Sequence, residues 1–284
     1  MTVLVFGGSS QIGYFLLPRL LAGGASVLAL SRRVHDSQAG GVRWLPGALP
    51  DAVPDELPMP SAIVSFGPLG PFAQWLARAD FGSEPPRVVA TSSMSAETKR
   101  GSSVPAERTI SQLLRDGEQA LAAACASHGA PWTVLRPTLI YGAGLDKSLS
   151  PIARRALRTR LFPLPAGRGL RQPVHAEDIA LAVLAALDCP ASAGRVLSIG
   201  GGERLTADAM FARVRQSLPR STMPLPLPSW LLRTGQRIAP KKLRGPLQRL
   251  DADLVADNDE IERLLGIRPR PFQVEAGMWF PVKG

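Results

Sequence analysis

The sequence predicts an α/β protein in which a doubly wound parallel sheet is followed by a small C-terminal lobe. Short β-rich segments alternate with segments of helical periodicity through the first half of the chain. This alternation favours parallel strands joined by right-handed crossover helices that cover both faces of the sheet. After about Gly142 the alternation weakens while proline and arginine become frequent, which indicates a smaller, loop-rich unit.

Segments rich in β-branched and apolar residues mark the expected strands. We expect strands at 2–6, 26–30, 42–45, 62–66, 87–91 and 133–136. Between the first two strands, Ile12, Phe15, Leu16 and Leu20 recur at helical spacing, and a glycine pair then ends the helix. Later helices are expected at 72–79, 109–127, 176–187 and 206–218.

The formal net charge of +10 comes almost entirely from arginine. An excess of basic residues is compatible with binding to nucleic acid, to an anionic membrane or to a phosphorylated ligand. The chain has no zinc-finger spacing and no aromatic RNA-binding signature, and its basic residues are scattered apart from Lys241, Lys242 and Arg244. We therefore expect an ordinary solvated basic surface with some phosphate-binding positions, no nucleic-acid partner and no metal site.

No apolar run approaches the roughly 20 residues of a membrane span, and the N-terminus lacks a signal-peptide pattern. Cys125 and Cys189 lie in apolar, helix-like stretches, which fits reduced thiols better than a disulfide framework. These features predict a cytoplasmic protein without a membrane span.

In residues 3–14, VLVFGGSSQIGY, a cluster of glycine and serine residues lies between a predicted strand and a predicted helix. This is the context of a dinucleotide-binding loop, in which the helix N-terminus favours a pyrophosphate. Gly7 permits the tight turn, Gly13 lets the helix approach the strand, and Ser10 replaces the middle glycine with a hydroxyl that can donate to a phosphate. The alternative is a plain strand-to-helix turn, as in a flavodoxin-like protein. We assign the dinucleotide site to Gly7, Ser9, Ser10, Gln11, Ile12 and Gly13.

The second predicted strand ends in LALSRR, so that Ser31, Arg32 and Arg33 stand where an NAD-preferring enzyme has Asp or Glu. Arginine can pair with a 2′-phosphate and stack on adenine. We therefore predict NADP(H) in preference to NAD(H), against the alternative of two solvated surface arginines. Phe66 and Gly67, at the end of the predicted strand 62–66, complete the expected cofactor site.

Six segments in order resemble the extended short-chain dehydrogenases, the NAD-dependent epimerase/dehydratase family. They are VFGGSSQIG, VVATSSMS, TVLRPTLIYGAG, PVHAEDIALAVLAAL, VLSIGGGERLT and LLGIRPRPF, and they span most of the chain. The resemblance implies a Rossmann domain over residues 1–165 and a mixed C-terminal part over 166–284. Within that part, about 171–201 would return to the Rossmann domain, and 202–284 would form most of a substrate lobe.

The resemblance also implies roles for single residues. Ser92 and Ser93 match the serine pair that ends the family's fifth strand, with Ser93 at the catalytic, substrate-contacting position. Arg171 matches an arginine that holds the substrate diphosphate in nucleotide-sugar enzymes, and Arg249 is a second candidate for that role.

The family's proton-transfer pair, Tyr-x-x-x-Lys, is missing. Its tyrosine exchanges a proton with the substrate, and its lysine lowers the tyrosine pKa and binds the nicotinamide ribose. Counting back from GEQAL puts Ile110 and Leu114 at the two positions, and neither tyrosine of the chain has lysine four residues later. The chain therefore resembles an atypical branch of the family. Ser93 and His175 remain as candidate catalytic residues, although His175 also fits a helix-entry residue with a structural hydrogen bond.

These features predict an NADP(H)-binding oxidoreductase or epimerase-like enzyme that acts on a small carbonyl or alcohol substrate, with a nucleotide sugar as a candidate. The alternative is a non-catalytic NADP(H)-binding sensor or assembly scaffold. A third interpretation is a nucleotide-sugar binder without redox function. A homodimer is compatible with the sequence.

Overall fold

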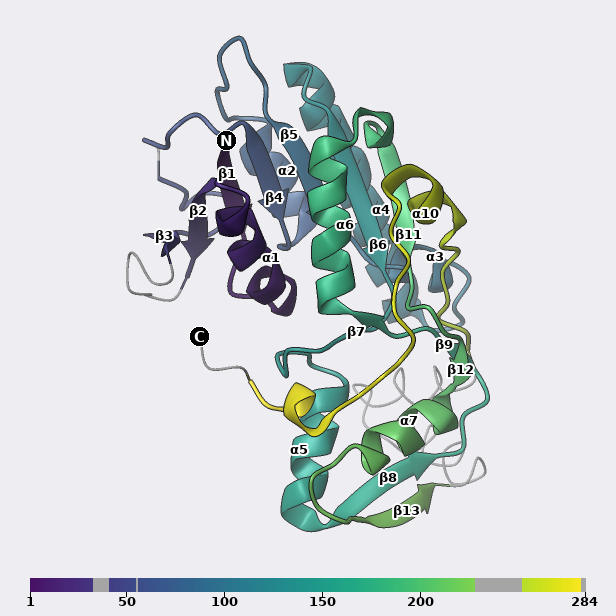
Figure 1. Cartoon of the computed structure of the whole chain (residues 1–284). Helices are drawn as coiled ribbons and strands as arrows, with labels where there is room; N and C mark the ends of the chain where they lie inside the picture. Colours follow the sequence, from purple (N-terminus) through teal and green to yellow (C-terminus); the bar gives the residue numbers. More distant parts are fainter. Residues whose placement is uncertain (33–40, 55, 228–251, 282–284) are drawn as a thin grey trace.

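The computed structural model describes residues 1–32, 41–54, 56–227 and 252–281 (Figure 1). Its centre is a parallel seven-stranded sheet in the order β11-β6-β5-β4-β1-β2-β3. The strands are β1 (Thr2–Phe6), β2 (Ser26–Ser31), β3 (Arg43–Pro46), β4 (Ala62–Ser65), β5 (Arg87–Thr91), β6 (Trp132–Pro137) and β11 (Arg195–Ile199). The chain runs outward from β1 in both directions, which confirms the predicted doubly wound sheet.

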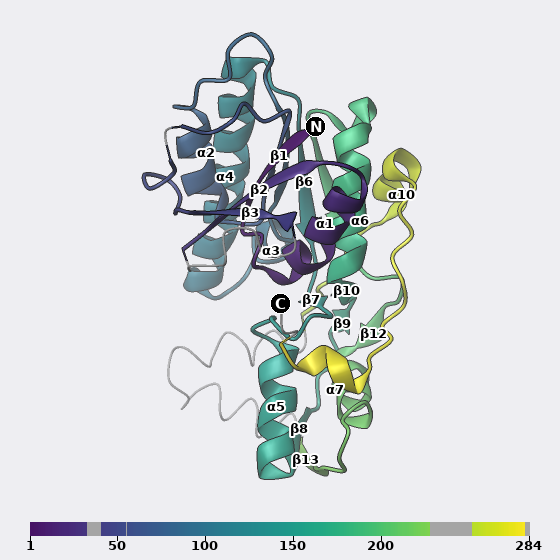
Figure 2. The same ribbon diagram turned by 60° about the vertical axis from the view of Figure 1, so that its left-hand side comes forward.

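Helices cover both faces of this sheet (Figure 2). One face carries α1 (Gln11–Ala22) and α6 (Ala176–Asp188), with α10 (Asp259–Leu265) beside α6, and the other carries α2 (Leu69–Leu76) and α4 (Pro105–His128). In β1, Val3 and Val5 pack toward α1 and α6, whereas Leu4 and Phe6 pack toward α2 and α4. A sheet buried on both faces needs apolar residues at successive positions, which explains why its strands are visible as apolar runs.

All six expected strands are present, with ends that differ by at most one residue. The helices α2 and α4 begin earlier than expected, at Leu69 and Pro105, because Pro68 and Pro105 occupy the helix starts. Proline has no amide hydrogen, but this costs little at the start of a helix, where the first amides have no intrahelical acceptor. The strand β11 and the helix α5 (Leu149–Thr159) were not expected as elements.

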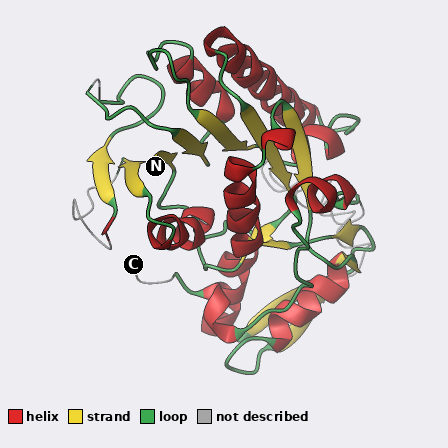
Figure 3. Ribbon diagram, turned by 45° about the horizontal axis from the view of Figure 1, so that its top comes forward, coloured by secondary structure: helices red, strands yellow, loops and turns green. Residues whose placement is uncertain are grey.

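The C-terminal lobe has its own apolar core below the large sheet (Figure 3). It contains α5, α7 (Ala207–Gln216), the parallel pair β8 (Leu161–Pro165) and β13 (Met223–Leu227), and the short helix η3 (Ala276–Trp279). The helix α5 and the strand β8 contribute to the lobe core, and the strand β11 joins the large sheet beside β6.

Short ladders lie between the two units. The strand β7 (Ile140–Tyr141) pairs with β10 (Val174–His175), and β9 (Leu170–Arg171) pairs with β12 (Leu205–Thr206). The last described segment runs from α10 back to the lobe (Figure 1). None of the helices in the described ranges has the length and apolar character that a membrane span requires.

Trp279 anchors the final segment in the lobe. Its side chain is fully buried, and its Nε1–H donates a hydrogen bond to the Ser217 hydroxyl (2.8 Å). The Arg154 guanidinium donates to the carbonyls of Gly144 (2.8 Å) and Trp279 (2.9 Å), which ties the same segment to α5.

We predict that Trp279→Ala lowers the free energy of unfolding by about 3–5 kcal/mol, the cost of emptying a buried aromatic site. Urea denaturation followed by circular dichroism measures this change. The adjacent Phe280 is 43% exposed, so Phe280→Ala serves as the control and should cost less than about 1 kcal/mol. Equal losses in the two variants would contradict an anchor at Trp279.

Candidate functional site

The loop between β1 and α1 turns at the carboxyl edge of the sheet. Gly7 has a φ of 77°, a left-handed conformation that glycine adopts without strain. The Ser10 hydroxyl caps α1 by accepting a hydrogen bond from the Gly13 amide (3.2 Å), and it keeps its own proton for another acceptor. A Cβ at Gly13 would overlap the Gly8 carbonyl, so only glycine lets α1 approach the strand this closely. The loop therefore holds a helix N-terminus over the end of β1, as an anion site requires.

The charges and polar atoms at this edge suit an anionic ligand. The first turn of α1 carries no acidic side chain. In the described part of the chain, Gln11 Oε1 and Ser92 Oγ are buried without a hydrogen-bond partner. A buried polar atom without a partner costs roughly 1–3 kcal/mol, which a ligand that hydrogen-bonds to it would offset. The predicted loop residues thus fit a dinucleotide.

The end of β2 lies at the same edge. Phe6 of β1 is in register with Leu30 of β2, so the residues that follow Leu30 emerge beside the glycine loop. Ser31 is buried in the strand, and Arg32 is exposed at its end. Arg33 lies outside the described residues. Among the described residues at the end of β2, up to Arg32, none is a carboxylate, and Arg32 carries a positive charge.

Phe66 and Gly67 flank the loop from the other neighbouring strand. A Cβ at Gly7 would lie 3.2 Å from the Phe66 Cβ, so the two chain segments touch. The Phe66 amide donates to the Phe6 carbonyl (2.9 Å), which continues the β1–β4 ladder by one residue. The structure therefore brings the described members of the predicted cofactor site together along three neighbouring strands.

Ser93 follows β5 at this edge, two residues beyond the strand. Its hydroxyl accepts a hydrogen bond from the Ser95 amide (3.2 Å), and its carbonyl accepts one from the Ala96 amide (2.9 Å). These bonds start the short helix α3 (Ser95–Thr98) and fix the direction of the Ser93 side chain. The hydroxyl can still donate to a substrate oxygen.

An ion network under Ser93 was missed by the sequence analysis. Arg136, in β6, donates hydrogen bonds to both carboxylate oxygens of Glu118 on α4 and to Glu97 on α3 (2.7 Å). The hydrogen bond from Arg136 to Glu118 raises the pKa of the guanidinium, so the pair stays charged. The network joins α3, α4 and β6 around the serine loop. Its signal in the sequence was the arginine of LRPT together with the glutamate of GEQAL, which are distant in sequence.

The helix α4 carries the two positions of the missing proton-transfer pair. Ile110 is 39% exposed, and Leu114, one turn later on the same side, is half-buried. The adjacent Glu107 and Ser111 are buried, where Glu107 accepts a hydrogen bond from Ser102 (2.7 Å) and Ser111 donates to the Ala96 carbonyl. The polar groups on this part of α4 therefore hold the helix against α3.

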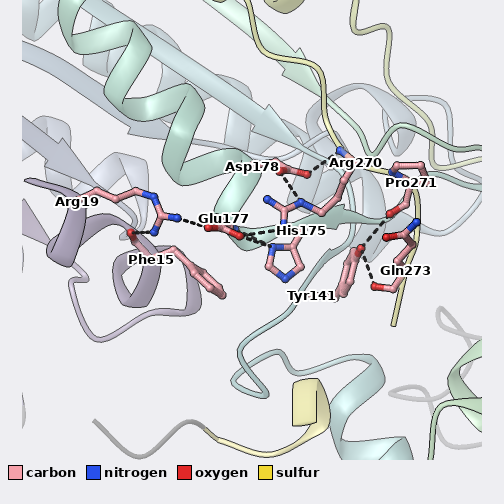
Figure 4. Close-up of polar contacts among 9 residues, drawn as sticks. All are labelled: Phe15, Arg19, Tyr141, His175, Glu177, Asp178, Arg270, Pro271 and Gln273. Carbon is pink, nitrogen blue, oxygen red and sulfur yellow. Dashed lines mark hydrogen bonds and ion pairs between the residues drawn. The ribbon is translucent and has the colours of Figure 1, made fainter. Parts of the chain in front are cut away.

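His175 caps α6 (Figure 4). Its Nδ1 accepts a hydrogen bond from the Glu177 amide (3.2 Å), and its buried ring packs between Phe15 and Tyr141, each about 5.1 Å away between ring centres. Burial lowers the pKa of His175 below its ordinary value near 6.5, and the positive charge of Arg270 lowers it further. The structure thus shows the helix-entry arrangement, with a neutral ring. A catalytic role for His175 stays a prediction.

Charged side chains surround this histidine and connect three segments (Figure 4). Glu177 pairs with Arg19 on α1 and with Arg270 (2.9 Å) in the final segment. Arg270 also donates to Asp178 (2.8 Å) through its side chain. The carboxylates here have arginine partners, and the described ranges contain no cluster of His, Cys, Asp or Glu that suits a metal ion.

Tyr141 does not replace the missing tyrosine. Burial raises its pKa to about 12, so it holds its proton at neutral pH. Its hydroxyl lies 3.5 Å from the carbonyls of Pro271 and Gln273, toward which it donates (Figure 4). The residue is part of the lobe core.

Of the two predicted substrate arginines, the structure describes Arg171, which lies in β9. Arg171 is buried, and its guanidinium donates to the carbonyls of Leu170 (2.8 Å) and Ala252 (2.6 Å). Arg249 lies outside the described residues. A role for either residue in holding a diphosphate stays a prediction.

Comparisons with known proteins agree with this architecture. A model of the NAD-dependent epimerase/dehydratase family matches residues 115–200. A UDP-glucose 4-epimerase from Vibrio cholerae is 24% identical over 157 residues, which cover 54% of this chain and 47% of that enzyme. The match therefore spans about half the length of this curated relative.

Solved structures share the fold over nearly the whole chain. A UDP-glucuronic acid 4-epimerase from Bacillus cereus, in complex with UDP-glucuronic acid and NAD, has a TM-score of 0.71 at 15% identity and covers 98% of this chain and 96% of its own. MoeE5, in complex with UDP-glucose and NAD, has a TM-score of 0.68 at 19% identity and covers 95% and 94%. Identities this low show a common fold.

The environment of His175 predicts a pH dependence of stability. Because the folded protein holds a neutral ring, the unfolded chain binds more protons below its pKa near 6.5. Stability is therefore complete above about pH 6.5 and falls as the pH drops from there toward the lowered folded pKa. In His175→Asn, which can still cap a helix, we expect a smaller slope of unfolding free energy against pH between about 5 and 7.

Urea titrations at successive pH values measure this slope. If His175→Asn retained the full wild-type slope, another group would be responsible for it.

Proposed function

Because the family-model match, the curated relative and the shared fold support a protein of the extended short-chain dehydrogenase/reductase family, we propose that this chain binds NADP(H) and acts on a carbonyl or alcohol substrate. The observation that most directly supports cofactor binding is the close packing of Gly13 on the Gly8 carbonyl. This packing holds the N-terminus of α1 over β1. The substrate class that we favour is a nucleotide sugar, since the related proteins are named for UDP-sugars.

The proposed preference for NADP(H) depends on the end of β2. Arg32 is exposed beside the loop, and β2, described as far as Arg32, does not end in the Asp or Glu that would bind the ribose 2′-hydroxyl of NAD. A guanidinium can pair with the 2′-phosphate through two hydrogen bonds. The related structures were solved with NAD, so this preference is a property proposed for this chain alone.

The chain's own residues limit the chemistry. A bound nicotinamide cofactor would supply or accept a hydride. Ser93 would orient the substrate oxygen, because its hydroxyl is held at the loop after β5 and can donate. Ile110 and Leu114 exchange no protons, so the proton would come from water. Positioned acid–base catalysis is typically worth about 10²–10⁴-fold, and turnover should be slower by a similar factor.

If Arg171 is to bind the diphosphate of a nucleotide sugar, its guanidinium has to exchange its present hydrogen-bond acceptors for the ligand. A diphosphate would have to replace the carbonyls of Leu170 and Ala252 as acceptors for its guanidinium. Binding of UDP would therefore include a rearrangement of the segment around Ala252. Arg249 is proposed as a second anion ligand from the sequence alone.

A second candidate function is a non-catalytic NADP(H)-binding sensor or assembly scaffold. Aliphatic residues at both positions of the proton-transfer pair favour it, together with the engagement of His175 and Tyr141 in packing. The two functions share the cofactor loop and differ in whether a reduced cofactor is consumed.

We predict that NADPH binds more tightly than NADH and that Arg32→Ala weakens NADPH binding by about 1.5–3 kcal/mol, the scale of a hydrogen bond to a charged group. NADH binding should be nearly unchanged. Thermal-shift assays with NADPH, NADH, UDP and UDP-glucose, followed by titration calorimetry, measure these affinities. Arg43→Ala, on exposed β3, is the matched control and should affect neither cofactor. Equal losses for both cofactors would refute the 2′-phosphate assignment.

Installing the missing pair tests the chemistry. We predict that the wild type oxidises NADPH slowly across a panel of ketones and UDP-sugars, and that Ile110→Tyr/Leu114→Lys raises the rate at least about tenfold. The matched control is Ile110→Phe/Leu114→Met, which adds similar bulk without a titratable group. Fast wild-type turnover that Ser93→Ala abolishes would show that the pair is unnecessary. Tight NADPH binding with no turnover in any variant would favour the sensor or scaffold.

A further inference from the structure

The positive charge of the protein is concentrated in the lobe. Residues 149–170 and 209–227 contain eight arginines and no aspartate, glutamate or lysine. The elements that they form include α5, β8 and β13, and the ends of these elements make the extremity of the lobe that is remote from the large sheet (Figure 1, Figure 2). Arg213 of α7 is paired with Glu203 (2.6 Å), so the arginines outside α7 are those that leave positive charge to attract anions.

Three of these arginines lie around the turn from α5 to β8. The Arg160 carbonyl accepts a hydrogen bond from the Met223 amide (2.7 Å), and its guanidinium donates to the Ser221 carbonyl (3.2 Å). These bonds bring the start of β13 against the turn. Arg158 and Arg220 line one groove of about 700 Å³ next to it. Arginines from two segments distant in sequence therefore share one surface.

Three exposed aliphatic side chains lie in the β8–β13 ladder, which starts at the same turn. Leu161 of β8 and Met223 of β13 are opposite each other in the ladder, and Leu225 follows two residues later on the same face. Their exposed fractions are 43%, 67% and 46%. Single exposed apolar residues are common, but three neighbours on one face form a patch that indicates an interaction surface.

The edge of this small sheet is closed to strand addition. In the described part of the chain, β13 pairs with β8 alone. Met223 and Leu227 direct their main-chain groups toward β8, so the outward positions between them are Pro224 and Pro226. Proline has no amide hydrogen to donate to a further strand. Pairing with a β-strand of a second copy is therefore disfavoured, and a side-chain surface remains.

We propose that the lobe tip, defined as Arg158, Arg160, Leu161, Arg220, Met223 and Leu225, docks onto the surface of an anionic lipid bilayer. The arginines contact lipid phosphates while the three aliphatic side chains enter the interface, which is the combination that peripheral membrane surfaces use. A nucleic acid would match the arginines but would leave the aliphatic strip without a role. The tip lies across the lobe from the cofactor loop, so docking leaves that loop open (Figure 1).

Vesicle sedimentation of the full chain tests this proposal. We expect binding to vesicles of phosphatidylcholine mixed with phosphatidylglycerol, weakening with added salt, and little binding to phosphatidylcholine alone. Arg158→Gln/Arg220→Gln should weaken binding by about tenfold or more, because each basic residue near an anionic surface contributes to attraction. The matched control Arg43→Gln/Arg263→Gln removes two exposed arginines from outside the lobe and should weaken binding by less than about threefold.

Two further variants separate a membrane surface from a general polyanion surface. Met223→Ser/Leu225→Ser keeps every charge, so it should weaken vesicle binding but leave any binding to a duplex DNA fragment unchanged. Arg160→Gly removes a charge at a φ of 61°, where glycine is favoured, so it should weaken vesicle binding while the protein stays folded. Thermal midpoints check folding in each case.

Several results would overturn the proposal. They are no binding of the wild type to the mixed vesicles, equal losses in the tip and control pairs, or wild-type vesicle binding by Met223→Ser/Leu225→Ser. Tight DNA binding combined with the last result would identify a nucleic-acid surface instead.

Discussion

The candidate site depends on the contact between Gly13 and the Gly8 carbonyl. It sets how closely α1 approaches β1, and therefore where the helix N-terminus points. The contact also reaches further, because Arg19 on α1 pairs with Glu177 at the start of α6, and Glu177 pairs in turn with Arg270. The segment that begins at Arg270 enters the lobe core two residues later with Phe272. The position of the lobe is thus linked to the cofactor loop through α1, α6 and the final segment.

The same architecture leaves few side chains near the candidate site available for proton transfer. The titratable groups that a reaction could recruit are already committed to structure: His175 caps α6, Tyr141 packs in the lobe, and Arg136 joins α3 to α4. Burial lowers the pKa of His175 and raises the pKa of Tyr141, so both side chains are stable in their neutral forms and exchange protons poorly at neutral pH. Ser93 is one of the hydroxyl side chains at this edge, with Ser10 and Ser92, that keep a proton to donate to a ligand. The two proposed functions share cofactor binding and differ in whether hydride transfer follows it.

The large sheet could be predicted because burial on both faces imposes apolar runs on its strands, and the glycine loop could be predicted because its spacing has a steric cause at Gly7 and Gly13. The lobe could not be predicted in the same way. In α5, Leu149, Ala153 and Ala156 form the buried face, but three arginines and a proline hide that pattern in the sequence. The buried contacts of Arg171 and the Arg136–Glu118 pair had no local signal, since their partners come from distant segments. Arg33 and Arg249 lie outside the described residues, so their predicted roles stay predictions.

The distribution of charge over the folded protein could not be predicted from the sequence either. The basic residues are spaced along the chain without a dominant run, and a net charge describes only their sum. Folding brings Arg158, Arg160 and Arg220 to one extremity through the β8–β13 ladder, whereas Arg19 and Arg270 are neutralised by carboxylates between the helices. Paired arginines contribute little to the long-range field, because the opposite charge lies within hydrogen-bond distance. The effective surface charge of the lobe tip is therefore larger, relative to its area, than the composition suggests. A field localised at one end would orient the molecule toward the proposed anionic surface before contact, which an even distribution of the same charges would not do.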